Sequence, residues 1–255
     1  MLLLLNTTKT MDFSMSVTAE QPALQPVFLD QARKLADEVA KMSPQELAGF
    51  MSISENLAAQ THEKFASWGK PGQPQVPVLF GFTGMIFKHL DAPSLSPEDL
   101  AFAGEHLRIL SGLYGLLAPF DLIEAYRLEM GYKLAVDGAS NLIQFWKQTL
   151  TERLNKEMPP GAPILSLASQ EYMKALDLKK LDHPVITAVF KEQRPDGSFK
   201  NVVVHAKKAR GAFVRYAIQN RARQPRDLAN FSAMGWGATQ QPPEEGPWLF
   251  TRPAE

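Results

Sequence analysis

Alternating stretches of apolar and polar residues divide the chain into short buried strands and amphipathic helices. Residues 2–5 are four consecutive leucines followed by polar residues, a pattern typical of a buried central strand. Residues 78–82 and 164–167 are predicted as further buried strands. Ligand-binding loops often follow the strands of sheets that helices cover on both faces, which draws attention to residues 6–10 and 169–172. For the first of these loops a solvated turn is the alternative.

Four helices are predicted before residue 160. Residues 26–41 and 142–157 have apolar positions at helical spacing with charges opposite. Ser43 and Ser96 each precede a proline, so each is expected to be the N-cap of a helix with proline in its first turn. The helix beginning at Ser43 should reach about residue 60, or continue to residue 68. The helix beginning at Ser96 should enter the segment that follows residue 106.

The last third of the chain reads as a hairpin followed by a helix. Asp196-Gly197 supplies a positive-φ turn between two predicted strands, residues 185–190 and 199–205. A helix is expected from there to about residue 223. Two short β segments, around 231–236 and 248–252, are expected to pair with each other.

Residues 107–131 contain more special-purpose residues than a plain core helix needs. Two glycines and a proline interrupt the apolar run, so one straight helix cannot continue through it. Tyr126, Arg127 and Glu129 then place a phenol, a guanidinium and a carboxylate within four residues. Polar groups in so apolar a segment either pair with one another or face a cleft.

Residues 110–115 are similar to the hairpin of a helix-hairpin-helix element, in which a tight glycine turn presents backbone N–H groups to a DNA phosphate. Ser111, Gly112, Tyr114 and Gly115 are therefore candidate phosphate-binding residues. Two residues rather than the usual one separate these glycines. A helix kink or close helix packing is the alternative interpretation.

Composition excludes several classes of protein. The chain has 255 residues, enough for one large domain (1–255), and 45% of them are hydrophobic. It has 27 basic and 27 acidic residues, so nucleic-acid binding would need a local basic patch. It has no cysteine, which excludes disulfides and thiol catalysis and suits a reducing compartment. No membrane span or signal peptide is recognisable, and we expect a cytoplasmic monomer.

Such a local basic patch is present in residues 200–226, which include eight lysines and arginines and no acidic residue. A concentration of positive charge of this kind attracts phosphates. The candidate phosphate-binding residues here are Lys207, Lys208, Arg210 and Arg215. A solvated basic helix face is the alternative for the run as a whole.

Familiar catalytic and metal-binding motifs are absent from the sequence. There is no G-x-S-x-G, H-E-x-x-H, Walker or G-x-G-x-x-G motif, and the five histidines are scattered without ligand spacing. The sequence therefore predicts no dedicated metal site and no cofactor.

Several segments together resemble the YaaA family of bacterial peroxide-stress proteins. They are HLRILSGLYGLLAPFDLIEAYRLEMG at 106–131, QFWKQTLTERLN at 144–155, LASQEY at 167–172 and HAKKARG at 205–211. The resemblance implies a single-domain α/β fold, with a mixed central sheet surrounded by helices and a helix-hairpin-helix-like element. It also implies a basic cleft that binds DNA, and a role in limiting damage from iron and peroxide.

The chain departs from the family pattern at two loops. Asn6-Thr7-Thr8 replaces the Ser-Pro-Ala of the first loop, although Lys9 and Thr10 remain as candidate phosphate ligands. Thr83 and Met85 stand where the family has lysine and aspartate. If the missing lysine and aspartate bind ligand or perform chemistry, this protein is altered in that respect.

Two functions follow as hypotheses. In the first, the protein binds duplex or distorted DNA through backbone phosphates with weak sequence preference. In the second, it is an enzyme acting on a nucleotide or base, with Glu129, Glu171 and Lys207 as catalytic candidates. The remaining residues expected to line the cleft are Tyr126, Arg127, Ser169 and Tyr172. A third possibility is that these polar clusters are ion pairs that hold the fold together.

Overall fold

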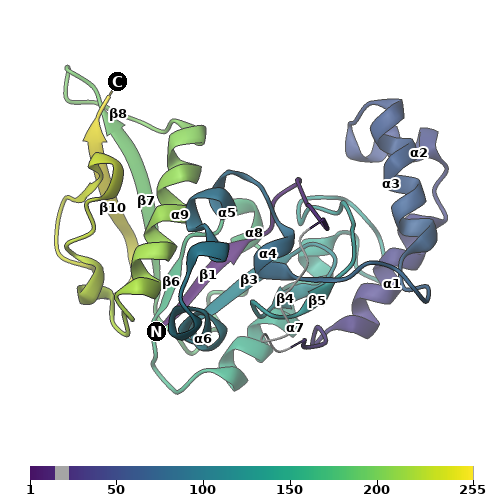
Figure 1. The fold of residues 1–255 in the computed structure, drawn as a ribbon, viewed down its shortest axis with the longest axis horizontal. Helices are drawn as coiled ribbons and strands as arrows, with labels where there is room; N and C mark the ends of the chain where they lie inside the picture. The colour runs from purple at the N-terminus through teal and green to yellow at the C-terminus, as the bar shows by residue number, and fades with distance from the viewer. Residues whose placement is uncertain (15–22, 255) are drawn as a thin grey trace.

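A mixed sheet forms the centre of the protein in a computed structural model, which describes residues 1–14 and 23–254 (Figure 1). Over these residues the sheet has eight strands, seven in the order β4-β3-β1-β6-β7-β10-β9, with β8 paired to β7 beside that path. The strands are β1 (Leu2–Asn6), β3 (Leu107–Ser111), β4 (Gly115–Leu117), β6 (Ile164–Ser166), β7 (Val185–Gln193), β8 (Phe199–Lys200), β9 (Gly237–Ala238) and β10 (Gly246–Pro253). The predicted α/β class with a mixed central sheet is confirmed.

Strand β1 lies inside this sheet, parallel to β3 on one side and to β6 on the other. Leu3 is opposite Leu107 and Leu165, and all five residues of β1 are buried. A run of four consecutive leucines is stable in a strand only where both sheet faces are covered, as they are here. Because β1, β3, β6 and β7 are parallel, their carboxyl ends reach the same edge of the sheet.

Helices cover the sheet and extend beyond one side of it. They are α1 (Leu29–Ala40), α2 (Pro44–Met51), α3 (Glu55–Ser67), α4 (Val78–Gly81), α5 (Met85–Leu90), α6 (Pro97–His106), α7 (Leu142–Glu157), α8 (Gln170–Met173) and α9 (Val203–Gln219). In Figure 1, α9 lies along β7 and α5 packs against α9, whereas α2 and α3 stand apart from the sheet on the opposite side.

The helix predicted from residue 43 is in fact two helices. Ser43 forms the expected capping box with Glu46, but the first helix ends at Met51, and the C-cap residue Ser52 has a left-handed φ of 52°. The side chain of Ser54 then caps a new helix by accepting the amide of Leu57. One continuous helix was predicted here, but Ser52 and Ser54 lie in a turn between two helices. Helices α2 and α3 therefore form a helical hairpin.

The helix predicted to enter residues 107–131 ends at His106 instead. Leu107–Ser111 is strand β3, and a tight turn returns the chain as the antiparallel strand β4. The prediction was wrong because pairing with the distant strand β1 satisfies the backbone of this apolar run. Gly115 has a φ of +71°, which the turn requires and glycine adopts without strain.

Three further expectations were wrong in detail. Residues 78–82 were expected as a strand, but Val78–Gly81 is helix α4, preceded by the two-residue strand β2 (Val76–Pro77), which pairs with β5 (Leu122–Ile123). The hairpin around Asp196-Gly197 is present, but its second strand ends at Lys200. Helix α9 begins at Val203, where helical spacing buries one face of the segment. In the last β pair, Gly237–Ala238 replaces residues 231–236 as the partner of β10.

Gly112 has a packing role that no larger residue could take. A Cβ atom added at this position would lie 2.4 Å from the carbonyl oxygen of Leu128 and 2.8 Å from the carbonyl carbon of Glu129. Both are backbone atoms, which cannot move aside as the end of a flexible side chain can. The turn after β3 and the chain at residues 128–129 are therefore in direct backbone contact.

We predict that Gly112→Ala lowers the free energy of unfolding by about 1–3 kcal/mol, the usual cost of overpacking a core. Gly49→Ala is the matched control, since nothing lies within 4 Å of its added Cβ and its site is an exposed position of α2. That control should raise stability by up to about 1 kcal/mol. Guanidinium unfolding monitored by tryptophan fluorescence measures both. Equal stability of Gly112→Ala and the parent would contradict the packing role.

Candidate functional site

The loops that follow β1 and β6 are joined directly to each other. The side-chain oxygen Oδ1 of Asn6 accepts the backbone amide of Ser169 at 2.8 Å. The hydroxyl of Thr7 lies 3.2 Å from that of Tyr172. Each loop was a candidate ligand loop because it follows a buried strand, with a solvated turn as the alternative for the first, and the structure brings the two together at one edge of the sheet.

Two buried tyrosines lie behind these loops. The hydroxyl of Tyr126 is 2.7 Å from that of Ser111. Burial raises the pKa of Tyr126 well above the usual range, and burial does the same to Tyr172. A hydrogen bond with Thr7 opposes the shift at Tyr172, whereas the negative charges of Glu129 and Glu171 add to it. Both carboxylates are therefore close to Tyr172, although they are far apart in sequence.

The segment 129–131 holds the two carboxylates. Glu129 forms an ion pair with Lys9, Nζ to Oε2 at 2.8 Å, and also accepts the hydroxyl of Tyr132 at 3.3 Å. Glu171 accepts the backbone amide of Gly131 at 3.2 Å. A Cβ atom at Gly131 would lie 2.8 Å from the carboxyl carbon of Glu171, so glycine permits this approach. Lys9 and Glu171 thus both contact the segment 129–131, Lys9 through Glu129 and Glu171 through Gly131.

Arg127 adds a guanidinium near these groups. Its Nε is buried and has no hydrogen-bond partner among the described residues. Its positive charge opposes the upward shift in the pKa of Tyr132, which arises mainly from burial and from the negative charge of Glu129. Arg127, Glu129 and Tyr132 therefore belong to the same electrostatic neighbourhood.

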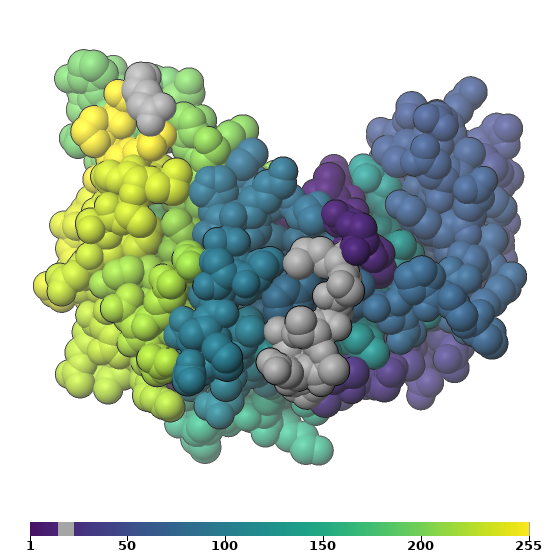
Figure 2. All heavy atoms as spheres, viewed as in Figure 1, coloured from purple at the N-terminus to yellow at the C-terminus, as the bar shows by residue number. Residues whose placement is uncertain are grey.

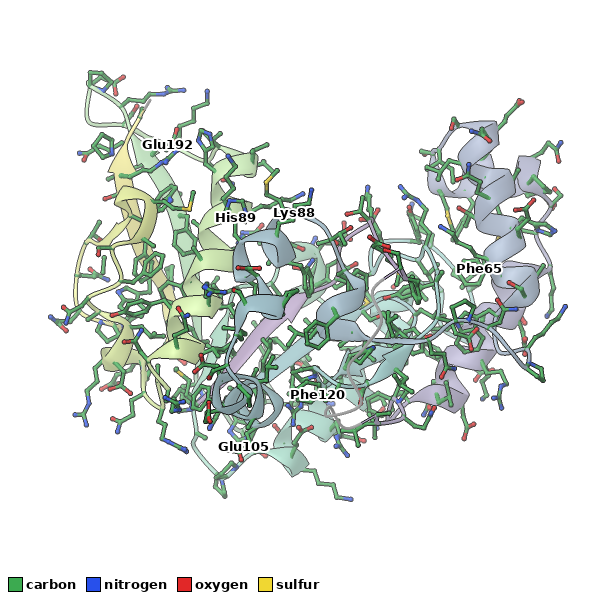
Figure 3. All side chains as sticks on the ribbon, in the orientation of Figure 1. Phe65, Lys88, His89, Glu105, Phe120 and Glu192 are labelled. Carbon is green, nitrogen blue, oxygen red and sulfur yellow. The ribbon has the colours of Figure 1, made fainter. Side chains whose placement is uncertain are left out.

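Helices α5 and α9 lie beside this group of residues, and the two helices are in close contact with each other. A Cβ atom added to Gly211 would lie only 2.1 Å from the carbonyl oxygen of Ile86 and 2.8 Å from Cβ of His89. Figure 3 places Lys88 and His89 on α5, beside the open space, with Phe65 of α3 across it. In the space-filling view a hollow separates α5 and α9 from the lobe of α1–α3, and the segment after β1 lies within it (Figure 2).

Arg210 projects from the middle of the buried face of α9, where its neighbours on the helical wheel are Ala206, Val214 and Ala217. Its Nε is buried, and Arg210 makes no hydrogen bond or ion pair with any residue of the described chain. Burial lowers the pKa of its guanidinium. Long helical side chains lean towards the helix N-terminus, which for α9 is the end at the loop edge of the sheet.

The basic run that contains Arg210 does not form one continuous patch. Lys207 is exposed and Lys208 half-buried near the start of α9. Arg215 donates to the carbonyl oxygens of Leu90 at 3.0 Å and Asp91 at 2.9 Å, and so satisfies the end of α5. It was predicted to bind phosphate, but the structure gives its guanidinium this role in the fold.

Cations further along the run are also engaged. Arg221 pairs with Asp99 at 3.5 Å, and Arg223 lies over the ring of Phe102, 5.8 Å from its centroid. They face α6 rather than the joined loops. Only the first part of the run contributes to the candidate site.

The glycine turn predicted to bind phosphate is buried. Ser111, Gly112, Tyr114 and Gly115 all lie in the core, with Ser111 fully inaccessible. The hydroxyl oxygen of Ser111 accepts the amides of Leu113 and Tyr114, so these donors are used internally. The segment is a strand–turn–strand rather than a helical hairpin, and its role here is packing beneath Tyr126.

The two departures from the family pattern face each other. A Cβ atom at Gly84 would lie 2.5 Å from Cβ of Thr8, and Thr83 donates its amide to the carbonyl oxygen of Thr10 at 3.1 Å. The altered first loop and the altered residues 83–85 therefore form one contact. Thr10 itself is exposed, as its predicted role needs.

The sequence interpretation missed a buried carboxylate that positions the start of α9. Glu192 of β7 accepts from Nδ1 of His205 at 2.6 Å and from a terminal nitrogen of Arg252 at 2.7 Å. Burial opposes ionisation of Glu192, but these hydrogen bonds and charges outweigh it and hold the pKa of its carboxyl below the usual range. Only the strand alternation of β7, which turns Glu192 inward, could have suggested this contact.

The described residues include no group of three or more histidine, cysteine, aspartate or glutamate side chains that could hold a metal ion. Within the same part of the chain, no helix has the length and apolar character to cross a bilayer.

Comparison with known proteins gives a consistent result. The family model described as peroxide stress protein YaaA matches residues 1–241. A UPF0246 protein of Hahella chejuensis is 40% identical over 256 residues, and one of Colwellia psychrerythraea is 38% identical over 256 residues; each match covers 99% of both chains. A UPF0246 protein of Marinomonas sp. is 37% identical over 252 residues, covering 98% of this chain and 96% of that protein.

Proposed function

The chain belongs to the peroxide stress protein YaaA family, and from this premise we propose that it binds DNA through backbone phosphates at the joined loops. In this proposal the site consists of Lys9, Arg127, Lys207, Lys208 and Arg210. Binding would limit the damage that iron and peroxide cause to DNA.

The observation that carries the proposal is the unpaired guanidinium of Arg210. Arg210 is partly buried, but its Nε has no access to water, and a buried donor left without a partner costs about 1–3 kcal/mol. None of the described residues supplies one to Arg210. An anionic ligand would, and guanidinium groups bind phosphate with two parallel hydrogen bonds. Groups that lower the stability of the folded protein and are nevertheless retained are typical of binding sites.

The surrounding cations extend the site beyond one phosphate. Lys207 is one helical turn before Arg210, and Lys9 keeps 54% of its side chain exposed despite its ion pair with Glu129. An exposed ion pair of this kind contributes at most about 1 kcal/mol, so Lys9 can exchange Glu129 for a phosphate at little cost. Lys88 lies beside the same hollow (Figure 3).

A link to peroxide stress follows from where iron causes harm. Fe(II) reacts with peroxide to give radicals at the place where the iron is bound, and phosphates of DNA attract cations. A protein that occupies those phosphates removes sites at which iron would otherwise react. The family's description as peroxide stress proteins agrees with this role.

A second candidate function is an enzyme that acts on a nucleotide or base. The position of two carboxylates favours this function. Glu129 belongs to the segment 129–131, Glu171 accepts the amide of Gly131 in the same segment, and the negative charges of both act on Tyr172. Two carboxylates in different surroundings can divide the roles of acid and base. In this alternative Glu171 is the better candidate base, because Glu129 is already paired with Lys9.

DNA binding through a few phosphates should depend steeply on salt. If about three phosphates are neutralised, the logarithm of affinity should fall with the logarithm of salt at a slope near −2.7, roughly a 40-fold loss between 50 and 200 mM. Fluorescence anisotropy with labelled duplexes of two unrelated sequences, and with a mismatched duplex, measures this slope. Affinity that does not change with salt, or no binding at 50 mM, would contradict the proposal.

Arg210→Met should separate binding from stability. We expect DNA affinity to fall at least ten-fold, because a ligand to phosphate is lost. The free energy of unfolding should not fall, because methionine fills the same partly buried position without leaving a buried donor unpaired. Arg215→Met on the same helix is the control, and it should lose about 1–2 kcal/mol with its hydrogen bonds to α5 while DNA affinity is kept. A destabilised Arg210→Met variant that binds DNA normally would refute the assignment.

The enzyme hypothesis has its own test. Duplexes containing uracil, hypoxanthine or 8-oxoguanine are incubated with excess protein, and base release is detected by alkaline strand cleavage. We expect any release to fall at least 100-fold in Glu171→Gln, whereas Glu152→Gln, an exposed position on α7, should have no effect. If none of these duplexes and no free nucleotide is altered, DNA binding remains the proposed function.

A further inference from the structure

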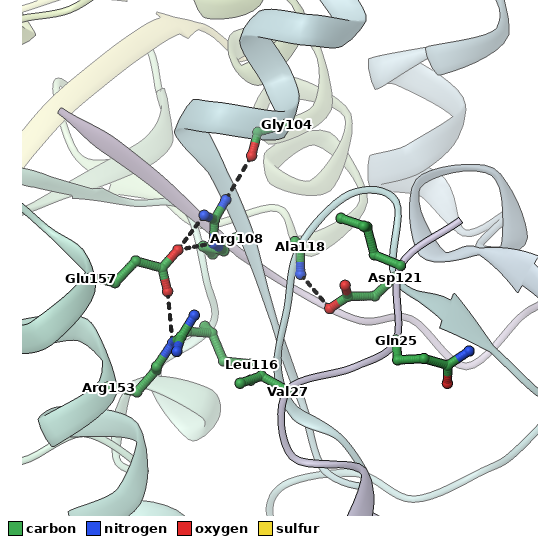
Figure 4. A pocket seen from close by; sticks show the side chains of 10 residues that line it. Gln25, Val27, Gly104, Arg108, Leu116, Ala118, Asp121, Arg153 and Glu157 are labelled. Atoms are coloured by element: carbon green, nitrogen blue, oxygen red, sulfur yellow. Dashed lines mark hydrogen bonds and ion pairs between the residues drawn. The ribbon is translucent and has the colours of Figure 1, made fainter. Parts of the chain in front are cut away.

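A second polar pocket lies at the opposite edge of the sheet, where β3 begins (Figure 4). Its volume is about 410 Å³, within the usual range for small-molecule sites. It is built from α6, β3, β4, the last turns of α7 and the loop before α1. Nothing in the proposed DNA site involves these residues, so the two sites are independent.

Most of the charge in this pocket is already neutralised. Glu157 accepts from Arg108 with one carboxylate oxygen and from Nε of Arg153 with the other, at 3.0 Å for Arg153. Arg108 also donates to the carbonyl oxygens of Gly104 and Leu107. The terminal nitrogens of Arg153 make no hydrogen bond with any residue of the described chain, and they line the pocket. The terminal nitrogens of Arg153 are therefore available as hydrogen-bond donors to a ligand.

Asp121 offers an acceptor in the same pocket. Its residue surface is 5% exposed, and its Oδ2 accepts the amide of Ala118 at 2.8 Å. No described residue donates to Oδ1, and Figure 4 shows that oxygen without a partner. Burial raises the pKa of Asp121 to about 6; the Ala118 amide and the charges of Arg108 and Arg153 oppose the shift, and Glu157 adds to it. Above pH 6 Asp121 is therefore mainly ionised.

The mouth of the pocket is apolar. Leu24 and Val27 line it and are 46% and 48% exposed, unusually high for large aliphatic residues in this chain. Leu116 provides a buried apolar wall. The pocket thus combines one free anionic acceptor, one free cationic donor and an apolar surface.

We propose that this pocket binds a free α-amino acid with an apolar side chain. The ammonium group donates to Oδ1 of Asp121, the carboxylate accepts from the terminal nitrogens of Arg153, and the side chain packs on Leu24 and Val27. Arg108, Arg153, Asp121 and Glu157 together carry two positive and two negative charges. A zwitterion with no net charge therefore pairs with both free groups without leaving an unmatched charge in the pocket.

The test is isothermal titration calorimetry of the full chain with L-leucine, L-methionine and L-phenylalanine at pH 7.5. At least one of them should bind. L-Leucinamide lacks the carboxylate, 4-methylpentanoic acid lacks the amine and glycine lacks the apolar group, so each should bind at least ten-fold more weakly. Affinity for the amino acid should fall about ten-fold per pH unit below pH 6, because protonated Asp121 no longer pairs with the ammonium.

Variants separate this site from non-specific binding. Asp121→Asn and Arg153→Gln should each lower affinity at least ten-fold, while Lys156→Gln, an exposed neighbour on α7 outside the pocket, should leave it unchanged. Near-ultraviolet circular dichroism and the melting temperature show whether each variant is folded. No binding of any of the three amino acids overturns the proposal. Equal binding by the amide or the acid, or by both folded pocket variants, also overturns it.

Discussion

The backbone contact between Gly112 and residues 128–129 is the constraint on which the candidate site depends. No side chain separates these two segments. The strand–turn–strand at residues 107–117 therefore determines the position of the backbone that carries Tyr126, Arg127 and Glu129. The hydrogen bond between Ser111 and Tyr126 holds the same two segments together.

The loops at the carboxyl ends of β1 and β6 complete the arrangement from the other side. Asn6 and Ser169 join them through one hydrogen bond, and Thr7 reaches Tyr172. The parallel register of the two strands brings the loops to the same edge, so their contact is a consequence of sheet topology. The site is therefore supported by buried hydrogen bonds, whereas its exposed charges contribute little to stability.

Charged side chains are arranged differently at the two ends of the parallel strands. At the edge where the loops after β1 and β6 meet, the Nε atoms of Arg210 and Arg127 are buried without hydrogen-bond partners among the described residues. At the opposite edge, Glu157 pairs with both Arg108 and Arg153, and Oδ1 of Asp121 and the terminal nitrogens of Arg153 have no partner among the described residues. The first environment matches the phosphate ligand proposed above, and the second matches the proposed zwitterion.

Local patterns in the sequence were enough to predict the buried strand at residues 2–5, the Asp196-Gly197 turn and the Ser43 cap, because each rests on neighbouring residues. The α/β class with a mixed central sheet was implied by the family resemblance. The same patterns could not show that residues 107–111 form a strand, since their partner is β1, about a hundred residues away. Nor could they distinguish Arg210 from Arg215. Both lie on α9, but only the packing of α5 determines that Arg215 finds carbonyl partners while Arg210 finds none. The residue types of the site were thus set by the sequence, and tertiary contacts decided which of them are free to bind.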